Sequence, residues 1–356
     1  MTESSTMDLV ALAQKQLSRR GLLRSAAAVG AAASLLPLLN QFAMAQADKP
    51  LKIAFSVPGL NFPFFVHMMD LAEQHAKEIG NIEFVKLDGQ QNGAPSSTKQ
   101  SSDLEAMVAE KVNGIVISPN DANALAPSIQ TVVEAGIPVV TVDRNVTEAK
   151  TLAHVGADNV LGGELQGKYL VQILPDGGDI YELQGQPGAT PAIDRHKGLT
   201  NILSKQDKIK VVVSQTAEFA RDKAVSVTES ALAGNPEPKA IVCANDDMAF
   251  GASEAAQDAG LSIPIIGFDA LPEALQAIQA GTQAATIEQF PGQQARTAID
   301  ILVAFLRNNE QPKQHDTYLN PKLITKDNLG EAERAAEAGI TPTGSPAGSP
   351  AATPVA

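Results

Sequence analysis

Short apolar runs alternate with longer amphipathic segments along this chain from Leu51 onward. The apolar runs are rich in valine and isoleucine, as buried strands are, and lie at 51–57, 82–87, 114–118, 138–142, 179–184, 210–214, 239–244, 264–268 and 284–288. Segments of helical length lie between them, at 64–80, 97–112, 122–136, 159–174, 190–205, 221–233, 246–260, 271–280 and 292–307. This alternation predicts an α/β protein with parallel sheets covered by helices on both faces. Because nine or more strands in one twisted sheet are unusual, we expect two doubly wound sheets in two lobes.

Polar and aromatic residues stand at or just beyond the ends of most of these strands. They are Ser56, Asn61, Phe64, Phe65, Ser118, Asp143, Arg144, Arg195, Phe219, Asn245, Asp269 and Gln289. Doubly wound sheets bind ligands in the crevice beyond the carboxyl ends of their strands. In such a crevice aromatic faces cover C–H surfaces, while carboxylates, amides and guanidinium groups pair with hydroxyls. The pattern therefore indicates a binding site for a small, hydroxyl-rich molecule.

Some of these residues also have a purely structural interpretation. Asp143 and Asn245 would serve equally well as caps of turns, and the aromatic pair at 64–65 as core residues. Arg195 has no neighbouring carboxylate except Asp194, and a lone arginine on a helix is usually solvated. We assign the acidic pair at 246–247 to a helix N-terminus, where a carboxylate stabilises a helix by about 0.3–1 kcal/mol.

The charge balance excludes one class of partner. The chain has 27 lysines and arginines against 40 aspartates and glutamates, a net charge of −13, and no basic cluster lies beyond the first 25 residues. Phosphate binding needs a concentrated basic face, so we expect no nucleic-acid partner. The single cysteine, Cys243, lies in an apolar run and is expected to be a buried strand residue.

Sequence motifs of enzymes and nucleotide sites are missing. The chain contains no G-x-G-x-x-G or Walker loop, no H-E-x-x-H, no G-x-S-x-G and no C-x-x-C, and its five histidines stand singly. We therefore expect a binding protein that uses no cofactor and no metal. A sugar-modifying enzyme is kept as an alternative, which would be recognised by a chemical change in the bound ligand.

The N-terminus has the features of an export signal. Arg19, Arg20 and two leucines precede an uncharged stretch at 25–47, which contains a signal-peptidase type site at 43–45. We predict a twin-arginine signal peptide over 1–45 and a location in the periplasm or on the outer face of the membrane. An uncleaved membrane anchor is the alternative. Cleavage would leave 23 basic and 38 acidic residues, a net charge of −15. At the other end, residues 341–356 are almost all Thr, Pro, Gly, Ser and Ala, which predicts a disordered tail.

Taken together, motifs between Leu51 and Asn328 resemble those of the ribose-type (type I) periplasmic sugar-binding proteins of ABC transporters. They include NFPFF (61–65), VDRN (142–145), HVGADNVLGGELQG (154–167), AEFAR (217–221), ANDDMAFGA (244–252), GFDALPEAL (267–275) and AATIEQFPGQ (284–293). The resemblance implies a fold in which the chain crosses between the lobes three times. It implies an N-terminal lobe of 48–157 plus 290–320, a C-terminal lobe of 158–289 plus 321–335, and a hinge position for Gln289.

The same resemblance implies roles for the strand-end residues. A sugar ring would lie between Phe64 and Phe65 on one side and Phe219 on the other. Its hydroxyls would pair with Asp143, Arg144, Arg195, Asn245, Asp269 and Gln289. The lobes would close around a neutral monosaccharide or cyclic polyol, and the closed form would be recognised by an ABC permease in the membrane. A chemoreceptor is a further partner compatible with this function.

Two positions depart from the pattern of ribose binders. Phe62 and Ser118 stand where ribose binders have asparagines, so an apolar ring and a shorter hydroxyl replace two amides. The motifs at 142–145 and 267–275 are more similar to those of members that bind inositol or other polyols. We therefore expect ribose to bind poorly and a ring polyol such as inositol to bind better.

A sugar-responsive transcriptional repressor is an alternative that uses the same two-lobed clamp. It needs a basic helix-turn-helix head before Leu51. This chain has an uncharged, alanine-rich segment there instead.

Overall fold

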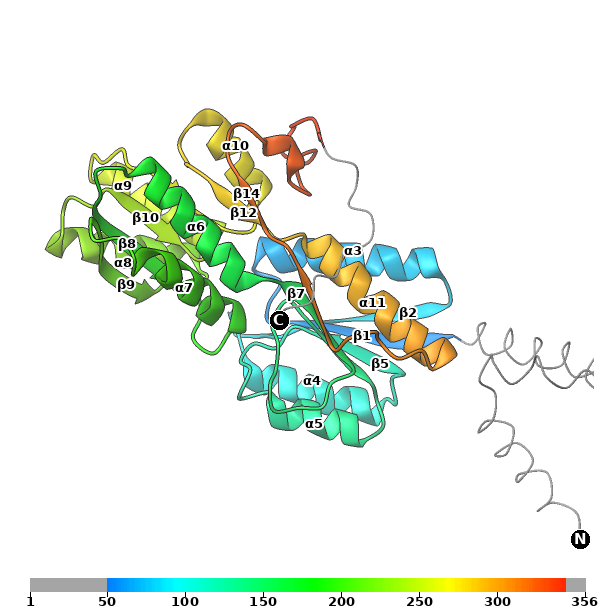
Figure 1. Ribbon diagram of the computed structural model, residues 1–356. Coiled ribbons are helices and arrows are strands. Elements are labelled where there is room, and N and C mark those ends of the chain that lie inside the picture. Colours follow the sequence, from blue (N-terminus) through cyan, green and yellow to red (C-terminus); the bar gives the residue numbers. More distant parts are fainter. Residues whose placement is uncertain (1–49, 344–356) are drawn as a thin grey trace, which may run out of the picture. The chain divides into compact units, whose positions relative to one another are not determined.

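The computed structural model describes residues 50–343 (Figure 1). The predicted export signal at 1–45 lies outside these residues, as do positions 344–356 of the predicted tail. At the start of that tail, the backbone N–H of Thr343 donates to the carbonyl of Gly330 at 2.8 Å. Between residues 50 and 343, no helix combines the length and the apolar character needed to cross a bilayer.

The first sheet has six parallel strands in the order β13-β7-β6-β5-β1-β2. These strands are β1 (Leu51–Val57), β2 (Ile82–Asp88), β5 (Gly114–Ile117), β6 (Val139–Val142), β7 (Ala153–Ala157) and β13 (Asp316–Leu319). A short antiparallel pair, β3 (Gln90–Gln91) and β4 (Ala94–Pro95), follows β2.

Helices cover both faces of this sheet (Figure 1). One face carries α3 (Pro63–Ile79) and α11 (Pro291–Asn308), and the other carries α4 (Ser97–Ala109) and α5 (Ala126–Glu134). In β5, Val116 packs in the core under α3 and α11, whereas its two neighbours pack in the core under α4 and α5. Burial on both faces explains why the central strands β5 and β6 are almost entirely apolar.

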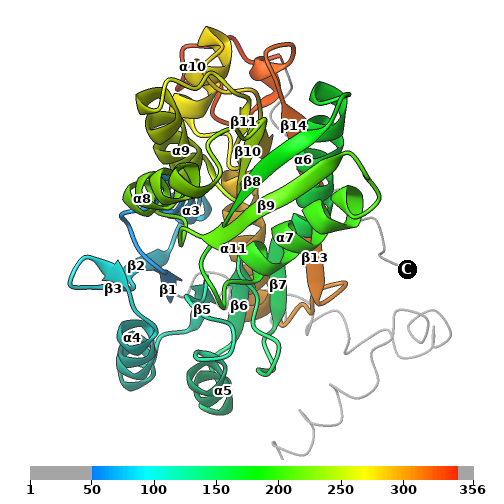
Figure 2. The same cartoon turned by 90° about the vertical axis from the view of Figure 1, so that its left-hand side faces the viewer.

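The second sheet has four parallel strands in the order β11-β10-β8-β9. They are β8 (Gly178–Gln184), β9 (Ile209–Thr216), β10 (Ala240–Cys243) and β11 (Ile265–Ile266). Figure 2 shows α6 (Asn159–Ile173) and α7 (Thr190–Leu203) on one face, and α8 (Arg221–Gly234) and α9 (Asp246–Asp258) on the other. Helix α10 (Pro272–Ala280) packs against the C-terminal segment, which contains the 3-10 helix η1 (Leu329–Glu331). Cys243 is buried in β10, as predicted.

The chain passes between the two sheets three times. It leaves the first sheet after β7 and enters α6, returns from β12 (Thr286–Glu288) to α11, and leaves again from β13 to β14 (Lys322–Ile324). β12 and β14 pair as an antiparallel ribbon. We call the first sheet with α3, α4, α5 and α11 the N-terminal lobe, and the second sheet with α6 to α10 the C-terminal lobe. The predicted fold class, two doubly wound lobes joined by three crossings, is confirmed.

Candidate ligand-binding site

A cavity lies where the carboxyl ends of strands from the two lobes face each other. It contains about 360 Å³ of space, its opening to solvent included. Its wall is formed by Phe62, Phe64, Phe65, Asp143, Arg144, Pro191, Arg195, Phe219, Asn245, Asp247, Asp269 and Gln289. The mixture of aromatic and polar groups in this wall is that of a site for a small molecule.

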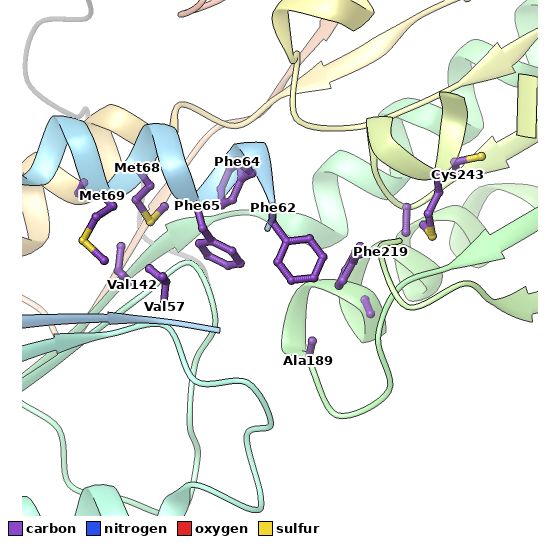
Figure 3. Close-up of a cluster of buried hydrophobic side chains, with 14 of the residues drawn as sticks. Val57, Phe62, Phe64, Phe65, Met68, Met69, Val142, Ala189, Phe219 and Cys243 are labelled. Carbon is purple, nitrogen blue, oxygen red and sulfur yellow. The ribbon is translucent and has the colours of Figure 1, made fainter. Parts of the chain in front are cut away.

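Aromatic rings enter the cavity from both lobes (Figure 3). Pro63 begins α3, and its fixed φ suits the first position of a helix, so Phe62, Phe64 and Phe65 cluster at the helix start. The Phe64 and Phe65 rings are 5.1 Å apart at 76°, and those of Phe62 and Phe65 are 6.1 Å apart at 75°. These edge-to-face contacts hold the three rings against one another.

Phe219 supplies the aromatic surface of the C-terminal lobe. A Cβ atom at Gly185 would lie 2.2 Å from its ring, so only glycine at this position leaves room for the ring. Figure 3 shows the Phe219 ring beside that of Phe62. The cavity is therefore bounded by apolar faces of both lobes.

Arg195 is fixed by contacts on three sides. Its Nε donates to Asn159 Oδ1 at 2.8 Å, its Nη1 donates to the Ala244 carbonyl at 2.6 Å, and its guanidinium lies 3.6 Å from the Phe268 ring centroid. Helices α6 and α7 can approach this closely because residue 163 is a glycine. A Cβ atom at that position would lie only 2.1 Å from the Arg195 carbonyl oxygen. No hydrogen bond to Arg195 Nη2 exists within residues 50–343, so this nitrogen is free to donate to a ligand.

Arg144 and Asp143 form the polar part of the N-terminal lobe. Arg144 Nη1 donates to the Asn120 carbonyl at 3.0 Å and to Gln186 Oε1 at 3.2 Å. The Ser118 hydroxyl donates to Asp143 Oδ2 at 3.3 Å, and Arg144 Nε lies 3.9 Å from the same oxygen. Each side chain thus has one end anchored to protein.

The second crossing contributes the Gln289 amide, and the segment after β11 contributes the Asp269 carboxylate. Gln289 Nε2 donates to Asp269 Oδ1 at 2.6 Å, and Arg195 Nη1 lies 3.6 Å from that oxygen. Gln289 Oε1 is buried and has no hydrogen-bond partner among residues 50–343. Asn245 caps α9, where its Oδ1 accepts from the Met248 N–H at 3.0 Å and its Nδ2 donates to the Phe219 carbonyl at 3.2 Å. It therefore fills both the structural and the cavity-lining roles that its position in the sequence predicts.

Burial shifts the ionisation of these groups. It raises the pKa of Asp143 and raises that of Asp269 well above the usual range, although the nearby arginines act in the opposite direction. Burial also lowers the pKa of Arg144 to about 10 and lowers that of Arg195. Removal of charge from water is the main cause in each case. The site holds its charges as opposite pairs, as buried charges must be held.

Several site residues have unusual backbone conformations. The φ angles of Asp143, Phe219 and Asp269 are 60°, 62° and 106°, in the region that favours glycine. A non-glycine residue there costs on the order of 1–3 kcal/mol, and such residues are concentrated at functional sites. Three residues with this unfavourable backbone conformation line the same cavity.

The structure brings most of the predicted site residues together. Phe64, Phe65, Asp143, Arg144, Arg195, Phe219, Asn245, Asp269 and Gln289 all line the cavity. Ser56, Asn61 and Ser118 are not part of its wall. Ser56 is buried and accepts from Gln100 Nε2 at 3.0 Å, Asn61 is exposed, and Ser118 acts through Asp143.

Three wall residues were not among those predicted to contact a ligand. Phe62, interpreted as an apolar replacement, and Pro191 both line the cavity. The assignment of the acidic pair to a helix N-terminus is right for Asp246 but incomplete for Asp247, which also lies in the wall. The only feature of the sequence that could have indicated a place for Asp247 in the wall is its position directly after Asn245 and Asp246.

Comparison with known proteins places these observations in a family context. The periplasmic binding protein domain model matches residues 53–310. The ribose import binding protein of Bacillus subtilis (strain 168) is 36% identical over 258 residues, which cover 72% of this chain and 82% of that protein.

Solved structures of solute-binding proteins are also similar to this chain. A Caulobacter myo-inositol binding protein bound to myo-inositol is 37% identical with a TM-score of 0.76, covering 81% of this chain and 98% of that one. An ABC transporter periplasmic solute binding protein from Actinobacillus succinogenes 130z with bound D-allose is 30% identical with a TM-score of 0.73, covering 78% of this chain and 99% of that one.

Proposed function

Because the chain belongs to the periplasmic binding protein family, we propose that its cavity captures a neutral monosaccharide or cyclic polyol for an ABC importer. The protein is a solute-binding protein and not an enzyme. The permease would recognise the form whose lobes are closed around the ligand.

One observation carries this proposal: the two buried carboxylates Asp143 and Asp269 each accept from the protein through one oxygen and leave the other oxygen for a ligand. Asp143 accepts from Ser118 through Oδ2, and Asp269 accepts from Gln289 through Oδ1. Within residues 50–343 the second oxygen of each carboxylate has no hydrogen bond. Fixed acceptors and donors between aromatic walls suit a molecule that carries hydroxyls on a ring with C–H faces.

Charge supports a neutral ligand. The wall contains two arginines and three aspartates, Asp143, Asp247 and Asp269. An anionic sugar would bring a further negative charge toward these carboxylates, whereas a neutral one only exchanges hydrogen bonds. A sugar phosphate or a uronic acid is therefore disfavoured.

Closure of the lobes is the proposed mechanism. Hydrogen bonds join the lobes beside the cavity: the Ala122 N–H donates to the Gly188 carbonyl at 3.0 Å, and the Asn145 N–H donates to Thr190 Oγ1 at 3.0 Å. A ligand that contacts both lobes favours this arrangement by its greater affinity for the closed form. The hinge would move about the three crossings, with Gln289 at the second.

The three crossings support a proposed division of the chain into two lobes. The proposed lobes are 48–157 plus 290–320 and 158–289 plus 321–335, preceded by a twin-arginine signal peptide at 1–45 and followed by a tail at 341–356. Export by this route would place the protein outside the cytoplasmic membrane, where an importer collects its solute.

For the ligand itself we favour a ring polyol such as inositol over ribose. Phe62 lies in the cavity wall and gives that edge an apolar surface. One solved relative is bound to myo-inositol, which supports the proposal. A ribose import binding protein is also similar, which keeps ribose as the second candidate.

A thermal-shift screen of pentoses, hexoses, inositols and linear polyols tests the proposed function. A tight ligand stabilises the folded protein by mass action and so raises the melting temperature. At a ligand concentration one hundred times the dissociation constant, the free energy of unfolding increases by about 2.7 kcal/mol. A ring polyol or monosaccharide should give the largest shift. The absence of a shift with every neutral sugar and polyol would contradict the proposal.

A further inference from the structure

Asp247 lies in the cavity wall at the second position of α9, and a neighbouring arginine orients its carboxylate. Arg221 Nη2 lies 3.4 Å from Asp247 Oδ1. The same guanidinium makes two hydrogen bonds to Glu273, at 3.1 and 2.7 Å, and lies 4.4 Å from the Phe250 ring centroid. Helices α8 and α9, which carry Arg221 and Asp247, lie side by side in Figure 2. The carboxylate is therefore held in a fixed direction.

The adjacent carboxylate shows by contrast what is unusual about Asp247. Asp246 has both oxygens occupied: Oδ1 accepts from Gln283, and Oδ2 accepts from the Leu271 N–H and from Thr286. Asp247 uses only Oδ1, and no hydrogen bond to its Oδ2 exists within residues 50–343. One oxygen of this cavity-wall carboxylate thus has no donor among the described residues.

The unpaired oxygen of Asp247 belongs to a set of acceptor atoms in the cavity. The cavity has three other acceptor atoms without a donor among the described residues: Asp143 Oδ1, Asp269 Oδ2 and Gln289 Oε1. Asp247 Oδ2 is the fourth. Each hydroxyl donates one hydrogen bond, and a ring oxygen donates none. When a ligand displaces water from the cavity, an acceptor left without a donor is costly, so a ligand that satisfies this set needs four hydroxyl donors directed at it.

We propose that Asp247 is a ligand-contacting residue that accepts a hydrogen bond from a hydroxyl and selects ligands with at least four hydroxyls, and that Arg221 and Glu273 position it. The proposal rests on the proposed function of sugar or polyol capture. A cyclohexane polyol with a hydroxyl on each carbon presents a hydroxyl at every ring position, whichever ring carbon faces Asp247. A sugar whose ring oxygen faces Asp247 does not.

The test is calorimetric titration of myo-inositol, D-ribose and the monodeoxy derivatives of both into the unmodified protein and into Asp247→Asn. Asp222→Asn is the matched control, because Asp222 is an exposed aspartate at the second position of the neighbouring helix α8. The two substitutions remove the same charge from equivalent helix positions, so their effects on helix stability should be similar.

We expect Asp247→Asn to weaken binding of the better probe by about tenfold or more, and Asp222→Asn to leave it unchanged. One monodeoxy derivative should bind the unmodified protein more weakly but lose nothing further in Asp247→Asn, because it lacks the hydroxyl that the carboxylate contacts. Arg221→Gln should weaken binding in the unmodified background and have no further effect in Asp247→Asn.

Two results would overturn the inference while leaving the proposed function intact. One is equal affinity of Asp247→Asn and Asp222→Asn for the better probe. The other is a loss of the same size for every monodeoxy derivative, which would indicate a general effect on the cavity. If the unmodified protein bound neither probe nor any member of the sugar and polyol screen, the proposed function itself would fail and this inference with it.

Discussion

The side-chain nitrogen of Gln186 lies 2.7 Å from the side-chain oxygen of Asn120, so a hydrogen bond joins the C-terminal lobe to the N-terminal lobe. Gln186 follows β8 and Asn120 follows β5. Gln186 also accepts from Arg144 Nη1 at 3.2 Å, although it is not part of the cavity wall. This amide therefore connects closure of the lobes to an arginine of the binding site.

Replacing Gln186 with alanine should weaken ligand binding without removing a ligand contact. Loss of hydrogen bonds that form only in the closed arrangement would lower its population, by about 1 kcal/mol or roughly fivefold in affinity. Calorimetry would give the affinity, and Gln215→Ala, an exposed glutamine of β9, is the control. Equal affinities of the two variants would show that the contact does not contribute to closure.

Asp269→Ala and Arg195→Ala should both reduce affinity but differ in their effect on the protein without ligand. Each removes a partner for ligand hydroxyls, at a cost of about 1–3 kcal/mol. Arg195→Ala also leaves the Asn159 side chain and the Ala244 carbonyl without their donor, so its melting temperature should fall. Asp269→Ala removes a desolvated carboxylate of raised pKa, which offsets part of the lost pairing. A larger melting-temperature loss for Asp269→Ala would contradict this account.

His154 should make the stability depend on pH. It is buried in β7 with its Nδ1 3.0 Å from Thr141 Oγ1, and burial lowers its pKa to about 4. In an unfolded chain the pKa is about 6.5, so between pH 6.5 and 4 the unfolded state binds a proton that the folded state does not. Its contribution to the free energy of unfolding therefore falls with pH, by about 3 kcal/mol once pH 4 is reached.

The variant His154→Asn isolates this contribution, because asparagine keeps a polar atom near Thr141 and does not titrate. Urea unfolding of both proteins between pH 7 and pH 4 gives the difference in the free energy of unfolding. The unmodified protein should lose stability relative to the variant as the pH falls. A difference that stays constant over this range would mean that His154 is protonated equally in the folded and unfolded states.

Export should depend on the identity of the arginine pair and not only on its charge. Replacing Arg19 and Arg20 with lysines keeps the positive charge but should leave the precursor in the cytoplasm, because the twin-arginine export machinery recognises the arginine pair itself. Cell fractionation followed by immunoblotting measures this. Undiminished export of the double-lysine form would assign the protein to the general secretory route.

The alternation of strands and helices could be predicted from the sequence because helices cover both faces of both sheets and the buried central strands are apolar. Strand β7 was missed because its residues, from Ala153 to Ala157, include a histidine and a glycine and no run of β-branched side chains. Its extended form is imposed by β6 and β13 on either side, and that pairing is a long-range property. Hydrophobic periodicity reports local preference and does not contain such information.

The same distinction applies to the binding site. Strand ends located the cavity, but which side chain at each end enters it depends on distant partners. Ser56 is unavailable because Gln100, 44 positions away, donates to it from α4. Asp247 enters the wall because Arg221 and Glu273 orient it from two other helices. Neither contact has a signature in the local sequence.

Phe62→Asn should shift specificity toward ribose. The phenylalanine gives one edge of the cavity an apolar wall, which discriminates between ligands by only about 1–3 kcal/mol, whereas an amide would pair with a hydroxyl and reject analogues that lack it. The ratio of the affinities for D-ribose and myo-inositol should therefore rise in the variant. An unchanged ratio would show that Phe62 does not determine specificity.

The most direct test of the central claim is a side-by-side calorimetric titration of myo-inositol and D-ribose into the unmodified protein. We predict saturable one-to-one binding of the ring polyol, with ribose about tenfold weaker or more, which corresponds to about 1.4 kcal/mol. A preference for ribose of tenfold or more would make the protein a ribose binder and contradict the specificity derived from Phe62. Heat-silent titrations with both, together with no thermal shift for any neutral sugar or polyol, would contradict the claim that this cavity binds such molecules.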